Sequence, residues 1–382
     1  MKLKKWLVLS IIGAVAQLAL TVAILVVSFP NLQDLYRVYG APEQDRQFYR
    51  YEYYRDGHFP LKQDQELSMV SLEAAADAGH LEAQRIYAMG CYDGTIAGPD
   101  AAKAYQFLIG LAGHGDQEAD YYLGLCQYWG YGTAVDYESA ATWFARAADQ
   151  GHTCAQSAIG GCYASGKGVP QDYAKAANYF MDAAEKGDPE AADWLGYLYF
   201  NGYGVPRDGQ AAASWYQKAA DAGIAHALRE LGYCYYYGYG ITQNYKKSFQ
   251  CYSKAANRGD AYAQWYVGTC LYSGFLIERD YTAAVSWFRK AAAQQQAQAF
   301  TSLGVCSFEG NGVEQDFDLA FQNFSEAARL GDPDGMDRLA YCLENGQGTA
   351  KDMAAALEWY RKAADGKNEH ARERLAELTA GD

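Results

Sequence analysis

Nine cysteines are the residues whose type and spacing could most readily do chemistry, as metal ligands or as disulfides. Six of them recur 36 or 72 residues apart: Cys126, Cys162, Cys234, Cys270, Cys306 and Cys342. Equivalent helices of stacked repeats lie at least roughly 8–10 Å apart, whereas a disulfide requires Cα atoms within roughly 7 Å. We therefore expect a column of small buried thiols that pack like apolar side chains.

Other chemistry is weakly indicated. Cys234 and Cys251 could bridge two helices of one repeat, and spacing alone leaves that disulfide open. His152 and Cys154 form the only near His/Cys pair, and neither an H-E-x-x-H motif nor paired C-x-x-C motifs occur. No nucleophile, base and orienting residue form a recognisable set. The sequence thus predicts no metal site, no cofactor and no catalytic residue, and the chain is not expected to be an enzyme.

The composition excludes two broad classes of protein. A hydrophobic share of 50% and an aromatic share of 15% are incompatible with a disordered chain. A formal charge of −14 argues against binding to nucleic acid, because polyanions need a surface rich in Lys and Arg. Tyrosine is unusually frequent, with 34 copies against 15 of phenylalanine.

The N-terminus predicts a membrane anchor. Lys2, Lys4 and Lys5 precede an uncharged stretch of 24 residues, 6–29. As a helix this stretch would reach roughly 36 Å, enough to cross a hydrocarbon core of roughly 30 Å. We expect residues 1–30 to be a signal-anchor helix and 31–44 a short juxtamembrane segment; cleavage of the helix as a signal peptide is the alternative.

The lysines before this helix predict its orientation. They should remain in the cytoplasm, which places the rest of the chain outside it, in a bacterial periplasm or at a cell surface. Free thiols fit a reducing compartment better. We favour the outside placement because buried thiols can survive there; if the helix is cleaved, the protein is secreted.

From Leu81 to Asn368 the chain divides without a gap into eight blocks of 36 residues. Position 3 of each block is alanine or, once, glycine, position 7 is a large apolar residue, and position 8 is glycine or alanine. This spacing puts the three positions on one face of a helix. Position 14 is always glycine, which suits a left-handed helix cap, and position 20 is aspartate or, once, asparagine, which suits the N-cap of a second helix.

A pair of helices this short cannot bury its own apolar stripe, so the pairs must stack. Residues 45–80 read as a degenerate further repeat with Asp64 at the capping position. Residues 369–382 repeat the first helix alone, with charged residues on its outer face, as a terminal cap. The sequence therefore predicts an all-α solenoid.

The motif in these blocks resembles the Sel1-like repeat, a relative of the tetratricopeptide repeat. The clearest copy is residues 191–223, with Leu195-Gly196, Tyr199, Gly202-Tyr203-Gly204-Val205, Asp208 and Trp215-Tyr216. The resemblance covers residues 45–382 and implies a right-handed α-solenoid that acts as an adaptor between proteins. A cysteine-rich branch of the family carries disulfides eight residues apart and weak beta-lactamase-like activity. The equivalent places here hold Ala183-Ala184, so that activity is not carried over. An envelope enzyme of this branch stays an alternative for which the sequence offers no catalytic set.

The resemblance also implies a binding face. In tetratricopeptide-like solenoids, positions 2, 5, 9, 12 and 13 of the first helix line the concave surface. Here we expect these positions to bind a protein or peptide through eleven residues: Tyr121, Tyr128, Trp129, Tyr197, Phe200, Arg229, Tyr233, Tyr236, Tyr237, Trp265 and Tyr272. Tyr236, Tyr237 and Trp265 should be the most exposed. The competing interpretation is that many of these side chains pack between repeats, and that the protein is a spacer using its convex surface.

The orientation of the chain gives a first prediction. A membrane-impermeant protease or thiol reagent applied to intact cells should reach the repeats, since the lysines keep only the N-terminus inside. Complete protection of the repeats in intact cells, with attack after lysis, would contradict the outside placement.

Overall fold

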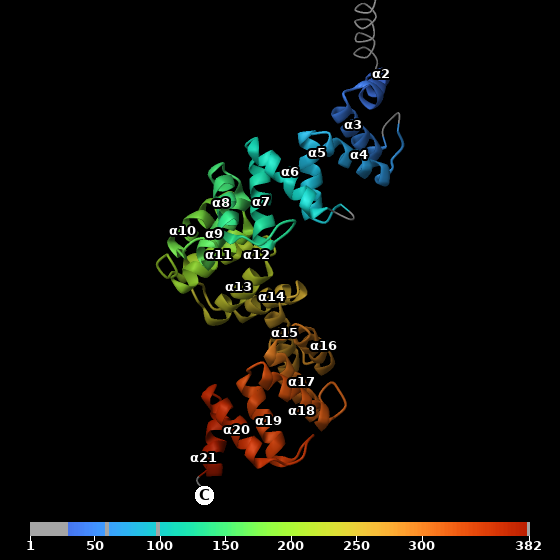
Figure 1. The fold of residues 1–382 in the computed structure, drawn as a ribbon. Helices are drawn as coiled ribbons and strands as arrows, with labels where there is room; N and C mark the ends of the chain where they lie inside the picture. Colours follow the sequence, from blue (N-terminus) through green and yellow to red (C-terminus); the bar gives the residue numbers. More distant parts are fainter. Residues whose placement is uncertain (1–29, 58–60, 97–99, 380–382) are drawn as a thin grey trace, which may run out of the picture. The chain divides into compact units, whose positions relative to one another are not determined.

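The computed structural model describes residues 30–57, 61–96 and 100–379, and these residues are helical throughout, without a strand (Figure 1). This confirms the all-α prediction for the described ranges. No helix within those ranges is both long and apolar enough to cross a membrane. The predicted anchor, residues 6–29, lies outside the described residues.

The chain forms two compact units whose boundary, between Tyr179 and Phe180, falls inside one helix, α10 (Tyr173–Glu185). The described residues of the N-terminal unit form a π-helix at Tyr36–Gly40 and eight further helices before α10. These are α2 (Pro30–Leu35), α3 (Glu43–Asp56), α4 (Gln65–Asp77), α5 (Leu81–Tyr92), α6 (Ala101–Gly113), α7 (Gln117–Trp129), α8 (Tyr137–Asp149) and α9 (Thr153–Ser165).

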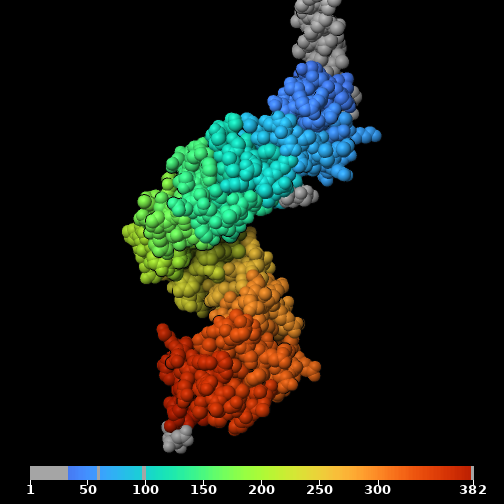
Figure 2. All heavy atoms as spheres, in the orientation of Figure 1, coloured from blue at the N-terminus to red at the C-terminus, as the bar shows by residue number. Residues whose placement is uncertain are grey.

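The surface of the C-terminal unit runs from green to red along the sequence in Figure 2. In its described residues this unit continues after α10 as eleven helices. These are α11 (Pro189–Asn201), α12 (Gly209–Asp221), α13 (Ala225–Tyr237), α14 (Tyr245–Asn257), α15 (Ala261–Ser273), α16 (Tyr281–Ala292), α17 (Ala297–Glu309), α18 (Phe317–Arg329), α19 (Pro333–Asn345), α20 (Met353–Asp365) and α21 (Glu369–Thr379).

The predicted caps set the ends of these helices. Asp208 accepts a hydrogen bond from the amide of Ala211 at the start of α12, and Asn244 accepts one from Lys247 at the start of α14. Gly202 and Gly238 end α11 and α13 in the left-handed conformation. Both predictions are confirmed, and both depend on residues within one or two turns of the helix end.

Within each repeat, position 8 of the first helix packs beneath position 28 of the second. A Cβ atom added to the glycine at position 8 would overlap an aromatic ring in four such pairs, namely Gly124 with Phe144, Gly196 with Tyr216, Gly268 with Phe288, and Gly304 with Phe324. These rings are among the most deeply buried side chains of the protein. The absence of a side chain at position 8 therefore fixes how closely the two helices approach.

A second glycine, at position 16, brings successive repeats together. In the C-terminal unit, a Cβ on Gly240 would overlap the backbone of Gly209, the first residue of α12. Gly312 makes the same approach to Tyr281, at the start of α16. The turn between two helices thus rests directly on the preceding repeat, and it does so in the left-handed conformation that glycine favours.

This contact predicts a difference between two left-handed glycines. Gly240→Ala should lower the free energy of unfolding by about 1–3 kcal/mol more than Gly259→Ala, because only the first adds a backbone overlap to the φ penalty. A Cβ on Gly259 has no neighbour within 4 Å. Urea denaturation of both variants measures the difference, and equal losses would show that the turn tolerates a side chain.

Candidate functional site

The aromatic residues predicted at position 12 pack inside the protein. All four are half-buried, and three contact the first residue of the second helix in their own repeat, with ring centroids 5.0–5.2 Å apart: Tyr128 with Tyr137, Tyr236 with Tyr245, and Tyr272 with Tyr281. Phe200 contacts Tyr239 at 4.6 Å instead. Burial, with a hydrogen bond to Glu309, raises the pKa of Tyr272 to about 12. In three of these repeats the side chain at position 12 therefore packs between the first and second helices.

The residues predicted at position 5 join one repeat to the next. Tyr121 stacks on His152, the N-cap of α9, with ring centroids 4.7 Å apart. The Arg229 guanidinium donates to Asp260, the N-cap of α15, over 3.2 Å. In the following repeat, Trp265 lies among partly buried apolar groups and its Nε1 donates to Ser302 Oγ over 3.1 Å.

Exposure separates the remaining candidates. Trp129 is 67% exposed, Tyr237 62% and Tyr233 36%, whereas Tyr236 and Trp265 are half-buried. The expectation that Tyr236 and Trp265 would be exposed is wrong, because Tyr245 of the same repeat packs on Tyr236 and Ser302 of the next repeat contacts Trp265. It is right for Tyr237.

The structure divides the predicted residues between the two units. In the N-terminal unit Tyr128 and Trp129 are in contact at 4.9 Å. In the C-terminal unit ring contacts form a continuous series that we call the aromatic strip: Phe200–Tyr233 (5.7 Å), Tyr233–Tyr237 (4.5 Å), Tyr237–Tyr236 (4.8 Å), Tyr236–Tyr245 (5.2 Å) and Tyr245–Phe275 (5.8 Å). Tyr197 lies beside Trp194 and Tyr203. Tyr272 and Trp265 are not members of the strip.

Two exposed residues of the strip, Tyr245 and Phe275, were missed by the sequence analysis, as were the exposed neighbours of Tyr197, Trp194 and Tyr203. None of the four occupies one of the five positions taken from tetratricopeptide-like folds. A signal existed for Tyr245, since position 21 is also aromatic in Tyr137, Tyr173, Tyr281 and Phe317.

The cysteine column is buried, as expected. Burial raises the pKa of the Cys126 and Cys234 thiols to about 12, so both stay protonated near neutral pH and are poor nucleophiles and metal ligands. Cys234 and Cys251 are free thiols, so the bridge left open by the sequence is not formed. In the described ranges no group of three or more His, Cys, Asp or Glu residues could hold a metal ion.

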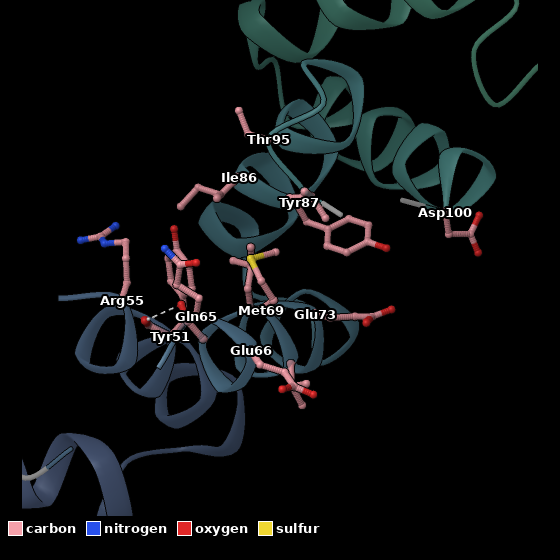
Figure 3. Close-up of a pocket in the computed structure, with 14 residues that line it drawn as sticks. Tyr51, Arg55, Gln65, Glu66, Met69, Glu73, Ile86, Tyr87, Thr95 and Asp100 are labelled. Carbon is pink, nitrogen blue, oxygen red and sulfur yellow. Dashed lines mark hydrogen bonds between the residues drawn. The ribbon is translucent and has the colours of Figure 1, made fainter. Parts of the chain in front are cut away.

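A hollow of about 770 Å³ lies among α3, α4 and α5 of the N-terminal unit (Figure 3). Met69, Ile86 and Tyr87 form its apolar centre, and Glu66 and Glu73 project from α4 beside it. It lies where a position-16 glycine would otherwise meet the preceding second helix. That position is Ile96, which packs instead against Gly90 of its own repeat. Thr95 and Ile96, from the turn after α5, line the hollow as well.

Ion pairs link α11, α13 and the N-cap of α15 in the C-terminal unit. His226 Nδ1 donates to Asp193 on α11 over 2.8 Å, and the Arg229 guanidinium donates to Glu230 over 2.7 Å. The hydrogen bond to Asp193 raises the pKa of His226 above its ordinary value, against an opposing effect of burial. The charges on α13 are therefore compensated locally, which leaves the tyrosines as its available contact surface.

Together these features define the class of protein. Helix pairs with glycine at fixed positions stack into all-helical solenoid units, and the C-terminal unit carries an exposed aromatic strip.

Sequence and structure comparisons identify the family. The Sel1 repeat model matches nine stretches, 52–80, 81–109, 117–152, 155–188, 189–224, 225–260, 261–296, 297–332 and 333–368, so the chain belongs to the Sel1 repeat family. No curated protein matches it.

Two crystal structures show the same repeat architecture. A protective antigen of uropathogenic Escherichia coli strains that displays an SLR fold is 28% identical, with a TM-score of 0.63, over 88% of this chain and 79% of that one. A Sel1 repeat protein from Oxalobacter formigenes is also 28% identical, with a TM-score of 0.55, over 81% of this chain and 90% of that one.

The His226–Asp193 pair predicts a pH effect. Because the folded-state pKa of His226 is raised, the pair stabilises the fold fully below the unfolded pKa of about 6.5, and this contribution is lost as pH rises through the folded value. Asp193→Asn should lower the His226 pKa, read from its imidazole NMR signals, and flatten the decline of thermal stability above pH 6. An unchanged pKa would show that Asp193 does not hold the imidazolium.

Proposed function

We propose that this protein is a scaffold that binds a polypeptide partner through the aromatic strip of the C-terminal unit. The observation that carries the proposal is the unbroken series of ring contacts from Phe200 to Phe275, four of whose six members are exposed to solvent. Membership of the Sel1 repeat family supports protein binding as the general role.

The physical case rests on the side chains of the strip. Tyrosine provides a large contact area with few rotatable bonds and a polar hydroxyl, so it loses little entropy when a partner orders it. Tyr233 and Tyr237 are already held by each other at 4.5 Å and by Phe200 and Tyr236 on either side. A surface ordered in this way before binding favours affinity.

We further propose that residues 6–29 anchor the scaffold in a membrane with the repeats outside the cytoplasm. The support is the sequence alone, namely the uncharged length of that stretch and the three lysines before it. An anchored solenoid would hold its partner at the membrane.

A spacer that uses the second helices is the alternative. In the C-terminal unit a lysine ammonium lies over a tryptophan ring in every second repeat, at 3.7 Å for Lys218 on Trp215 and 4.1 Å for Lys290 on Trp287. These pairs give the second helices a surface of their own that combines a cation with an indole.

The proposal predicts a selective loss of binding. Tyr233→Ala/Tyr237→Ala in the full chain should weaken partner binding at least tenfold, because both rings are exposed and central in the strip. The tagged chain would be solubilised from membranes, its co-purifying proteins identified by mass spectrometry, and the affinity of the recovered partner measured with purified protein.

Two matched variants make this experiment decisive. Trp129→Ala removes a similarly exposed aromatic residue from the other unit, and Trp215→Ala/Trp287→Ala removes two of the three lysine–tryptophan pairs of the alternative surface, leaving Lys362 on Trp359. Retention by both controls, with loss in the tyrosine variant at unchanged helical content, supports the strip. Loss only with the tryptophan pair would replace it by the spacer function.

A further inference from the structure

Residues 30–56 form a segment that we call the collar, which comprises α2, the π-helix and α3 and is drawn in blue in Figure 1. The π-helix of the collar precedes the first repeat, so the repeat pattern does not account for it. Helices of this kind are rare and occur frequently at functional sites. The collar directly follows the uncharged stretch 6–29 and contains six of the 34 tyrosines of the chain, namely Tyr36, Tyr39, Tyr49, Tyr51, Tyr53 and Tyr54.

The π-helix turns two of these tyrosines toward solvent. Val38 is fully buried, whereas Tyr36 is 48% exposed and Tyr39 is 55% exposed. The ring of Tyr36 lies against Gly40, where an added Cβ atom would come within 2.8 Å of the ring. The collar therefore presents two large aromatic rings on its surface, on either side of a buried valine.

Contacts with α3 hold this surface in place. Arg50 Nε donates a hydrogen bond to the Val38 carbonyl over 3.1 Å, and the Arg50 guanidinium lies 5.7 Å from the centroid of the Tyr39 ring. On the preceding helix, α2, Asp34 accepts a hydrogen bond from the Tyr53 hydroxyl over 2.5 Å. The exposed rings are therefore held on α3, which belongs to the first repeat.

The charges of the collar are largely paired, which leaves the rings as its main source of attraction. Residues 30–56 contain four arginines and five carboxylates, so the segment is almost neutral. Three of the arginines lie beside a carboxylate: Arg37 beside Asp34, Arg46 beside Glu43, and Arg55 beside Asp56. A strongly charged ligand thus finds little complementary charge here, whereas a partner that takes up aromatic rings finds two.

The closeness of the two rings to the proposed anchor indicates what that partner is. Tyr36 and Tyr39 lie seven and ten residues beyond residue 29, which in a helix is roughly 10 and 15 Å. The headgroup layer outside the hydrocarbon core is about 5–8 Å thick on each side. Proline disfavours the helical conformation in the residue before it, so the chain can change direction at Pro30 and bring the collar alongside the membrane. Tyrosine is enriched in this layer because its ring is apolar and its hydroxyl is polar.

Building on the membrane anchor proposed above, we propose that Tyr36 and Tyr39 insert into the headgroup layer of the bilayer that residues 6–29 enter. The partner of this surface is the lipid itself. Neutral headgroups are sufficient, because the charges of the collar are paired among themselves. Since both tyrosines are held on α3, the contact keeps the first repeat against the membrane surface.

The test places a photoreactive side chain of tyrosine-like shape, p-benzoylphenylalanine, at position 36, 39 or 237 of the full chain, one position at a time. Each variant is reconstituted in phosphatidylcholine vesicles that contain a trace of alkyne-tagged phosphatidylcholine. The lipid attached on irradiation is then measured by fluorescence after gel electrophoresis. Position 237 is the matched control, because Tyr237 is 62% exposed and belongs to the C-terminal unit. Positions 36 and 39 should attach at least about tenfold more lipid than position 237.

Lipid charge and salt show which side chains make the contact. Attachment at positions 36 and 39 should change by less than about twofold when anionic phosphatidylglycerol is added or salt is raised, because the collar is almost neutral. Attachment that requires anionic lipid and is abolished by salt would show that the arginines make the contact, and would overturn insertion of the tyrosine rings.

Flotation of the same vesicles separates this proposal from the anchor. If the chain floats with the vesicles and resists extraction at alkaline pH, but positions 36 and 39 attach no more lipid than position 237, the anchor stands and the collar contact is overturned. Attachment of these positions to a second copy of the chain in place of lipid overturns it as well. If the chain does not float, the anchor and the collar contact both fail, while the proposed role of the aromatic strip is unaffected.

Discussion

The contact between a bare glycine and a buried ring is the constraint on which the rest of this structure depends. At Gly196 the first helix of a repeat has no side chain, and the ring of Tyr216 from the second helix fills that space. Any Cβ there would separate the two helices, and with them the turn that rests on the preceding repeat. Two repeats have alanine at position 8 instead, where Ala88 accompanies Leu108 and Ala340 accompanies Tyr360 at position 28.

This close packing decides which side chains are available for binding. The side chain at position 12 packs against the second helix, where the residue at position 21 covers it, as Tyr245 covers Tyr236. The side chain at position 5 contacts the start of the next repeat, as Arg229 does by donating a hydrogen bond to Asp260. The side chain at position 13, the next residue of the first helix, remains exposed, as Tyr237 and Trp129 show.

The aromatic strip combines structural and binding roles in one series of residues. Tyr236 is half-buried and supports the exposed Tyr237, so the ring that contacts solvent is held by one that cannot be removed without disturbing the repeat. The charges nearby are paired within the protein, which keeps the surface of α13 largely apolar in character. The strained Leu276 turn extends this surface at a cost that glycine would avoid.

The sequence by itself determined the repeat length, the helix pairs and their ends. Asp208 caps its helix, and Gly202 ends the one before it, because an N-cap and a left-handed C-cap depend only on residues within a turn of the helix end. The buried column at Cys126 and Cys234 follows from the same register.

Only the tertiary structure decided which aromatic residues are exposed, since burial depends on side chains that arrive from other repeats. Trp265 and Trp129 both occupy positions that the sequence assigned to the concave face, yet Ser302 of the next repeat contacts Trp265, while Trp129 stays open to solvent. The conformation of Leu276 was likewise visible only in the structure. Six other repeats have glycine at this position, and a leucine there could have changed the turn. It adopts the same left-handed conformation instead, which is strained for leucine.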